Sequence, residues 1–265
     1  MIKPRTISWV LILLFVLGWA TFYLIQRYPD KLDSKNEYSD ILRKGELRVC
    51  GEYDPFSFYE DSTGQHGFHR ELIQAFASQH GLKVVYRYDG NVDRRVKGLE
   101  NGTYDILMGP LPVITPLKQR LAFTMPLYTS RLVLIQRSTG SPIRNQVELA
   151  GKRLVIPAFS PIIYRINHLA TEISDSIFVR SVRITTNEEL VRLVLSGKED
   201  FAAMDEHVAK ALKATYPGMD CSTPLSLPQF QAWAVRPGST VLLDSLNAFI
   251  ERYKKSPAFE RLLQQ

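Results

Sequence analysis

Hydrophobic and polar residues alternate along the first half of the chain with two different periods. Short apolar-rich runs with many β-branched or aromatic residues are typical of strands, and they occupy 46–50 (ELRVC), 82–88 (LKVVYRY) and 104–108 (YDILM). Amphipathic stretches with a helical period separate them, from about Arg70 to His80 and over 92–100. Because a crossover between parallel strands needs about a dozen residues, this β-α-β-α-β order predicts an open α/β sheet.

The same order of elements starts again after the turn-forming segment 138–142 (STGSP). Strands are predicted at 152–157, 177–182 and 200–205, and helices from Pro161 and over 188–195. A further strand at 230–236 and an amphipathic helix over 242–253 complete the pattern. The chain is therefore predicted to fold as two α/β lobes.

A segment without charged residues, 7–25 (ISWVLILLFVLGWATFYLI), precedes these lobes. As a helix it would be about 28 Å long, enough to cross the hydrocarbon core of a bilayer, so an N-terminal transmembrane helix is predicted. A cleaved signal peptide is the alternative, because Gly18 and Ala20 frame a small-x-small cleavage site. With an anchor, residues 1–6 form a cytoplasmic tail, 26–45 form a linker, and the lobes face the periplasm from the cytoplasmic membrane.

The composition limits the classes of function. Of 265 residues, 45% are hydrophobic and 23% are charged, which is a globular balance. The net charge of +6 comes from 33 basic and 27 acidic residues without a long block of either sign, so no nucleic-acid partner is predicted. The five histidines lack close metal-ligand spacing, and no nucleophile-elbow or phosphate-loop motif occurs. The sequence predicts no metal, no cofactor and no catalysis.

Several segments resemble, in their order and spacing, the bacterial extracellular solute-binding proteins of family 3. They are the opening ILRKGELRV with PFSFYEDSTGQHGF (55–68), then GTYDILMGPLPVITP (102–116), AFTMPLYTS (122–130), LAGKRLVIP (149–157) and FAAMDEHVA (201–209). The resemblance implies a two-lobed type 2 periplasmic-binding-protein fold. It places lobe 1 at 46–136 and 232–265, lobe 2 at 137–231, and the ligand in the cleft between them.

Three other segments, 67–77, 166–173 and 229–236, look like the binding half of the membrane-bound lytic transglycosylases, a family of cell-wall enzymes. In that family a Glu-Ser dipeptide introduces the catalytic acid of the other half, and this chain contains no such dipeptide. The resemblance therefore implies a binding module without catalysis. One alternative is an enzyme on the same fold, either a cell-wall lyase remnant or a dehydratase-like protein. The other is a degenerate module that binds a protein or a glycan.

Loops that follow strands point into the crevice of an open α/β sheet, so candidate ligand contacts are sought there. After the first strand, the resemblance places a ligand-stacking aromatic at Tyr53, with Phe56 in the same loop. Tyr53 could instead pack on the surface of its lobe. After the strand 104–108, Gly109 and Pro110 stand where amino-acid-binding relatives have small hydroxyl residues.

The same relatives place an arginine a few residues further on, where its planar fork binds the carboxylate of the ligand. Leu117 or Lys118 falls at that position here. Arg120 lies close by and is either a substitute or a surface residue. The sequence therefore does not predict standard capture of an α-carboxylate.

Lobe 2 supplies two more candidates. Ser160 as N-cap, with Pro161 at the first helical position, would aim free backbone N–H groups at an anion, or simply cap the helix. Asp205 matches the family position that takes a ligand ammonium group, or it complements the dipole of the next helix. Together the candidates predict closure on a small polar solute: an amino-acid-like molecule, a peptide or a cell-wall fragment. The expected downstream partner is an ABC permease or a cell-wall enzyme.

Overall fold

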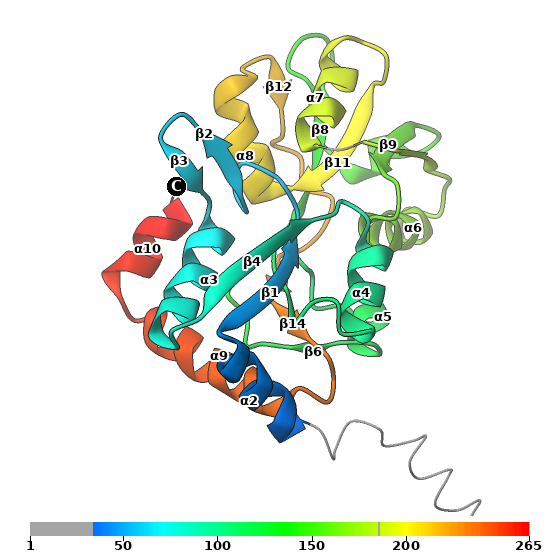
Figure 1. The fold of residues 1–265 in the computed structure, drawn as a ribbon. Helices are drawn as coiled ribbons and strands as arrows, with labels where there is room; N and C mark the ends of the chain where they lie inside the picture. The colour runs from blue at the N-terminus through cyan, green and yellow to red at the C-terminus, as the bar shows by residue number, and fades with distance from the viewer. Residues whose placement is uncertain (1–33, 185, 265) are drawn as a thin grey trace, which may run out of the picture.

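The computed structural model describes residues 34–184 and 186–264. Within them the chain forms two α/β lobes, each built around a five-stranded sheet (Figure 1), which confirms the predicted architecture. The predicted anchor at 7–25 lies outside the described residues. Among the helices that are described, none has the length and apolar character needed to span a membrane.

The sheet of lobe 1 has the strand order β4-β1-β5-β14-β6. Its strands are β1 (Glu46–Gly51), β4 (Lys83–Tyr88), β5 (Ile106–Leu107), β6 (Ala122–Phe123) and β14 (Ala234–Val235). β1 runs parallel to β4 and β5, whereas β14 is antiparallel to β5 and β6. Because side chains alternate along a strand, Leu47 and Val49 of β1 join one apolar cluster and Cys50 joins another.

Helices cover both faces of this sheet. The cluster around Leu47 and Val49 includes side chains of α3 (Phe68–Gln79) and α9 (Thr240–Tyr253). The cluster around Cys50 includes side chains of α4 (Val92–Glu100). The Asn91 side chain caps α4 by accepting a hydrogen bond from the backbone N–H of Arg94 at 3.0 Å. The amphipathic pattern at 92–100 therefore predicts this helix correctly.

Lobe 2 has the strand order β10-β9-β11-β8-β12. Its strands are β8 (Leu132–Arg137), β9 (Arg153–Pro157), β10 (Phe178–Val182), β11 (Phe201–Asp205) and β12 (Met219–Asp220). The helices that pack on them are α6 (Ile162–Glu172), α7 (Asn187–Leu195) and α8 (Glu206–Thr215). β9 runs parallel to β10 and β11, so the three parallel strands have the same spatial order as those of lobe 1.

Two strands carry the chain between the lobes. β7 (Tyr128–Ser130) leads into β8, β13 (Gln229–Gln231) returns toward β14, and the two pair antiparallel. We call β7 and β13 the hinge strands. The smaller elements are β2 (Tyr59–Asp61), β3 (Gly64–His66), α5 (Thr115–Lys118), a 3-10 helix at Gln146–Leu149, and α10 (Pro257–Gln264).

Two boundaries differ from the prediction. The predicted lobe 1 segment 46–136 contains most of β8, but β8 pairs with β11 and β12 and so belongs to the sheet of lobe 2. The predicted strand 230–236 is interrupted between β13 and β14. Trp233 lies in this gap and is fully buried. Its backbone N–H donates to the side-chain hydroxyl of Thr124, whereas in a continuous strand it would donate to a backbone carbonyl of the neighbouring strand. The periodicity of the sequence shows neither the strand partners of β8 nor the hydrogen bond that interrupts the strand at Trp233, because both depend on residues far away in the chain.

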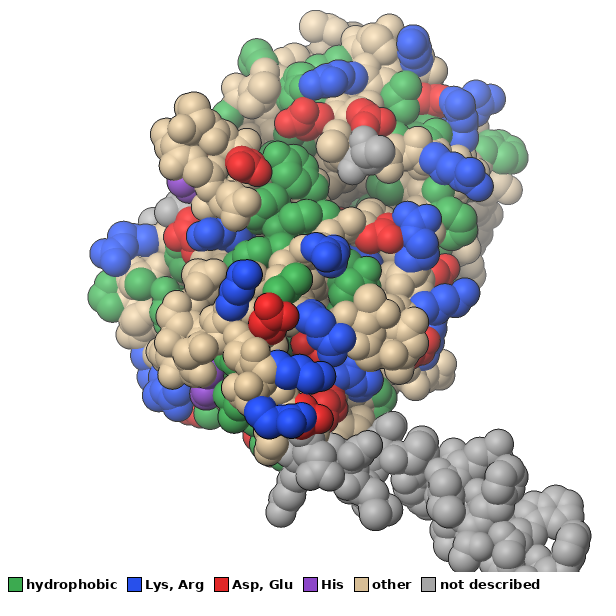
Figure 2. All heavy atoms as spheres, viewed as in Figure 1, with side chains coloured by type: hydrophobic (Ala, Val, Ile, Leu, Met, Phe, Trp, Pro, Cys, Tyr) green, Lys and Arg blue, Asp and Glu red, His purple; other side chains and the backbone are tan. Residues whose placement is uncertain are grey.

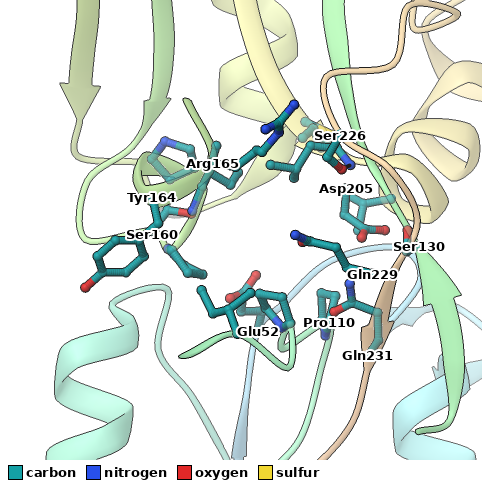
Figure 3. Close-up of a pocket in the computed structure, with 18 of the residues that line it drawn as sticks. Glu52, Pro110, Ser130, Ser160, Tyr164, Arg165, Asp205, Ser226, Gln229 and Gln231 are labelled. Carbon is teal, nitrogen blue, oxygen red and sulfur yellow. Dashed lines mark hydrogen bonds between the residues drawn. The ribbon is translucent and has the colours of Figure 1, made fainter. Parts of the chain in front are cut away.

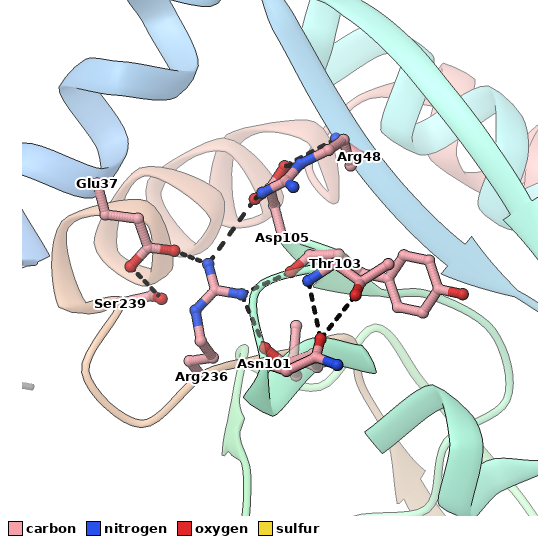
Figure 4. Close-up of polar contacts among 9 residues, drawn as sticks. Glu37, Arg48, Asn101, Thr103, Asp105, Arg236 and Ser239 are labelled. Atoms are coloured by element: carbon pink, nitrogen blue, oxygen red, sulfur yellow. Dashed lines mark hydrogen bonds and ion pairs between the residues drawn. The ribbon is translucent and has the colours of Figure 1, made fainter. Parts of the chain in front are cut away.

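The predicted linker 26–45 is also corrected, because 34–44 forms a helix, α2 (Ser34–Lys44), that packs against α9. Tyr38 and Ile41 are buried in that contact. Glu37 pairs with Arg236 and accepts a hydrogen bond from the Ser239 hydroxyl at 2.7 Å (Figure 4). This helix was missed because most of its residues are polar, so that the segment resembles a linker in composition.

Candidate ligand-binding cleft

A cleft of about 1400 Å³ lies between the lobes. Its lining comes from loops after β1 and β5, from the start of α6, from the end of β11, and from both hinge strands. Figure 3 shows side chains from these elements turned toward one cavity. The carboxyl ends of the parallel strands meet at this edge, which is where an open α/β sheet places ligands.

The structure brings five of the predicted residues to the cleft and leaves three elsewhere. Those that line it are Tyr53, Pro110, Lys118, Ser160 and Asp205. Phe56 is instead buried and stacks on Phe68, with the ring centroids 5.2 Å apart. Gly109 is not among the residues that line the cleft, and its φ of 121° favours glycine. Arg120 pairs with Glu100 on the surface of lobe 1 at 2.8 Å.

Asp205 is positioned by the junction of β11 and α8. Its carboxylate caps α8, accepting a hydrogen bond from the backbone N–H of His207 at 2.9 Å. Burial raises the pKa of Asp205 to about 6, Glu52 adds to the rise, and hydrogen bonds from Ser130 and from backbone N–H groups oppose it. The carboxylate is therefore ionised above about pH 6 and lies at the edge of the cleft.

Glu52 is a cleft residue that the sequence prediction missed. It follows β1 directly, and Arg95 of α4, only 2% exposed, pairs with one of its oxygens. Figure 3 shows the Glu52 carboxylate below the cavity and turned toward it, opposite Asp205. A charged residue immediately after a buried strand was a usable signal, because that position lies at the ligand-binding edge of the sheet.

The hinge strands supply uncharged polar groups that the prediction also missed. Ser130, Gln229 and Gln231 line the cleft. Gln231 is only 4% exposed, and its amide oxygen has no hydrogen-bond partner among the described residues. No local pattern identifies these residues, because β7 and β13 meet only through tertiary pairing.

Most cationic groups of the cleft are already paired. Arg94 pairs with Asp89 at 2.7 Å, Arg131 with Glu206 at 3.0 Å, and Arg165 with Glu172 at 2.8 Å. Lys118 is exposed and forms no ion pair within 34–184 and 186–264. Leu117, the other candidate for the arginine position, is buried. A guanidinium free to clamp a carboxylate is thus missing beside β5 in the described structure.

Aromatic side chains surround the polar groups. The exposed ones that line the cleft are Tyr53, Tyr88, Phe159 and Tyr164. Phe159 is 51% exposed and has a φ of 62°, a left-handed conformation that is costly for a bulky residue. Such strain is common at binding sites, because the surrounding structure holds a side chain where a ligand needs it.

A buried network holds hinge strand β7 to lobe 1. The indole N–H of Trp233 donates to Nδ1 of His69 at 2.9 Å, so the proton of a neutral His69 ring sits on Nε2 and is donated to the Tyr128 hydroxyl at 3.0 Å. Burial lowers the pKa of His69 to about 3, which keeps the ring neutral. On the lobe 2 side, His207 contacts Ser130 at 3.0 Å. Hinge strand β7 is therefore anchored at both ends.

Among the residues that the structure describes, no group of three or more His, Cys, Asp or Glu side chains could hold a metal ion. The residues that line the cleft offer hydrogen bonds, charges and aromatic surfaces. These groups can bind and orient a polar molecule.

Curated relatives of this chain are membrane-bound lytic murein transglycosylases F. The one from Ectopseudomonas mendocina (strain ymp) is 27% identical over 227 residues, which is 85% of this chain and 46% of the relative. The one from Desulfosudis oleivorans is 26% identical over 93% of this chain and 52% of the relative. The chain thus spans about half the length of the curated relatives it matches.

Solved structures share the fold. A mutant of ArgBP from T. maritima has a TM-score of 0.74 at 21% identity, over 85% of this chain and 96% of that one. An ancestral arginine-binding protein bound to arginine has a TM-score of 0.74 at 22% identity, over 83% and 97%. The model of one family matches residues 47–265. This chain belongs to the bacterial extracellular solute-binding proteins, family 3.

Proposed function

We propose that this chain is a membrane-anchored periplasmic module that closes its lobes on a small polar solute and catalyses no reaction. The observation that carries the proposal is the cleft of about 1400 Å³, whose lining comes from both lobes and from the hinge strands. A solute that contacts both lobes stabilises the closed form, because a ligand favours the state in which it makes more contacts.

The relatives support a choice of solute class and of partner. A protein of similar fold binds arginine, which supports an amino-acid-like solute as the first class to test. Short peptides and cell-wall fragments come next, because the curated relatives are named murein transglycosylases. The same relatives favour a cell-wall enzyme as the downstream partner, with an ABC permease as the alternative. The face in Figure 2 intersperses basic and acidic side chains, which offers little to a nucleic acid.

The test is thermal unfolding of the full chain in detergent against amino acids, peptides, organic acids and muropeptides. A solute at a hundred times its Kd adds about 2.7 kcal/mol, or about 5 to 10 °C in Tm. Small-angle scattering of the same samples should report a more compact particle. Unchanged unfolding and scattering with every class would contradict the proposal.

The enzymatic alternative has its own test. The full chain is incubated with peptidoglycan and with prephenate-like acids, and products are separated by chromatography. We expect no turnover above that of buffer. Turnover that disappears in Asp205→Ala would replace the proposed binding module with an enzyme on the same fold.

A further inference from the structure

We propose that the free edge of β10, together with a cationic groove beside it, binds an extended acidic peptide segment of a partner protein. This surface belongs to lobe 2 and is separate from the proposed solute site, so the inference goes beyond the proposed function. The bound segment adds a strand to the sheet of lobe 2 and places its carboxylates beside basic side chains.

The first observation is that β10 is the outer strand of its sheet and has an unpaired edge. On its other edge, the N–H of Phe178 and the carbonyl of Val182 bond to residues that flank β9, at 2.9 and 2.8 Å. Because backbone groups alternate in direction along a strand, those of Val179 and Ser181 point away from β9. They have no hydrogen-bond partner among the described residues. Such an edge is a template for another strand.

The second observation is a groove of about 730 Å³ between the end of β10 and α7, which we call the β10 groove. Ser181 lines it, so the groove adjoins the free edge. Among the described residues, its lining includes one acidic side chain, that of Glu189, and four basic ones: Arg180, Arg183, Arg192 and Lys198. The lining of the groove therefore carries more positive than negative charge.

Part of this positive charge is available to a partner. Arg180 and Arg192 each pair with a glutamate. Arg183 and Lys198 are exposed and form no ion pair within 34–184 and 186–264. A further exposed base without an ion pair in the described chain is Arg153 of β9, which is aligned with the first residue of β10. Three cationic groups near the strand can therefore accept carboxylates of a bound segment.

These charges decide which kind of strand the edge accepts. Pairing of two copies of this chain through β10 would bring the basic side chains of both copies together, and like charges on neighbouring strands are destabilising. An acidic strand gains the backbone hydrogen bonds and is also electrostatically complementary to the groove. Phe178, which is 60% exposed at the start of β10, offers an apolar contact to the same segment. The occupant is therefore an acidic segment with an apolar side chain.

The experiment is fluorescence anisotropy of a labelled short peptide in which Glu alternates with Val, titrated with the full chain in detergent. One control peptide has Lys in place of Glu, and another is the acidic peptide with N-methyl groups on the N–H groups that would pair. We expect each control to bind about tenfold more weakly, since each lacks one of the two kinds of contact. Added salt should weaken the acidic peptide, and inorganic phosphate at the same ionic strength should have no further effect.

The first pair of variants tests the backbone edge. Ser181→Pro removes an N–H that points away from β9, and proline is tolerated at such a position of an edge strand. Ser181→Ala removes the hydroxyl and keeps this N–H. We expect Ser181→Pro to lower the affinity about tenfold and Ser181→Ala to leave it unchanged.

The second pair tests the charges and still applies if Ser181→Pro fails to fold. Arg153→Gln/Lys198→Gln removes two exposed bases, whereas Arg183 stays because it also lines the cleft. The control, Lys44→Gln/Lys97→Gln, removes two exposed bases from lobe 1. We expect about a fivefold loss of affinity in the first double variant, because exposed ion pairs are weak, and almost none in the control.

The outcomes decide the proposal. Absence of binding by the acidic peptide would overturn it and show that the basic residues only keep other strands away from the edge. Equal binding of the N-methylated peptide, or an unchanged affinity in Ser181→Pro, would also overturn it, because only charge would then be recognised. Loss of binding in Ser181→Pro and in the lobe 2 double variant, with both controls intact, supports it. Solute binding in the cleft should be the same in all four variants.

Discussion

Lobe 1 and lobe 2 present their parallel strands to the cleft in the same order, and each has an aspartate with a raised pKa near the end of one of these strands: Asp54 follows β1, and Asp205 is the last residue of β11. In lobe 1, Asp54 is 2% exposed and accepts hydrogen bonds from the backbone N–H groups of Phe56 and Ser57 at 2.9 and 2.8 Å. Burial raises its pKa to about 7. In lobe 2, burial raises the pKa of Asp205 to about 6, but this carboxyl lines the cleft.

The difference separates a structural carboxyl from one that is available to a ligand. Asp54 organises its own loop through hydrogen bonds to one carboxyl oxygen, which offset part of the cost of burial, while its other oxygen is buried without a hydrogen-bond partner among the described residues. Asp205 also caps a helix, but its carboxylate faces the space between the lobes. The same residue type, with the same cause of a raised pKa, therefore has two roles that substitutions can tell apart.

The largest expected effect is on solute binding. Asp205→Asn should lower the affinity for an amino-acid-like solute about a hundredfold, because the charged partner of the solute's ammonium group is lost, while asparagine still caps α8. Isothermal titration measures the change. Asp54→Asn is the matched substitution in lobe 1, and we expect it to change affinity less than threefold. Equal losses of affinity in Asp205→Asn and Asp54→Asn would contradict the proposed difference in role between the two carboxyl groups.

The next effect is on stability and depends on pH. A carboxyl whose folded pKa is raised to about 7 contributes stability that is present below its unfolded pKa and is lost as the pH rises through 7. Asp54→Asn removes this loss, so the variant should match the wild type near pH 4 and exceed it by about 2 kcal/mol at pH 8, or about 5 °C in Tm. Thermal unfolding at the two pH values measures it. A gain of the same size at both values would rule out the titration of Asp54 as the cause.

A smaller effect concerns the strained aromatic of lobe 2. Phe159→Gly should raise stability by about 1 kcal/mol, because glycine adopts a positive φ without strain, and it should weaken solute binding about fivefold by removing a ring from the cleft. The control is Ser174→Gly, since Ser174 has a φ of 55° and does not line the cleft. It should give a similar rise in Tm with unchanged affinity. If both variants bind equally well, Phe159 is not part of the site.

The smallest effect is expected at Ser160. Its hydroxyl accepts a long hydrogen bond, 3.3 Å, from the backbone N–H of Ile162. The prediction that Ser160 is the N-cap of α6 is wrong, because the helix begins at Ile162 and Pro161 is its N-cap. Ser160→Ala should therefore cost only about 0.5 kcal/mol of stability, through the loss of this one long hydrogen bond. Its effect on affinity should stay under threefold if Glu52 and Asp205 make the main contacts with the solute. A tenfold loss in titration would instead indicate that the start of α6 binds an anionic group of the solute.

The sequence places a candidate residue at the cleft where a strand end alone decides its position. Tyr53 follows β1 and Asp205 ends β11, and both line the cleft, while their roles as ligand contacts stay predictions. Phe56 was misplaced because the distance along the chain from a strand end does not show which way a side chain turns, and this ring turns into the core. Gln231 was missed because its partner strand lies far away in the chain.

The sequence by itself determined the two α/β lobes, since hydrophobic period and crossover length are local properties that survive in any packing. It also carried the family, whose segments recur in order over most of the chain. Only the tertiary structure decided that β8 belongs to lobe 2, that α2 docks on α9, and that Glu52 faces Asp205 across the cleft. The physical reason is that strand pairing and charge balance depend on contacts between segments that are distant in the chain. A local sequence pattern does not show which distant segment a buried residue will contact.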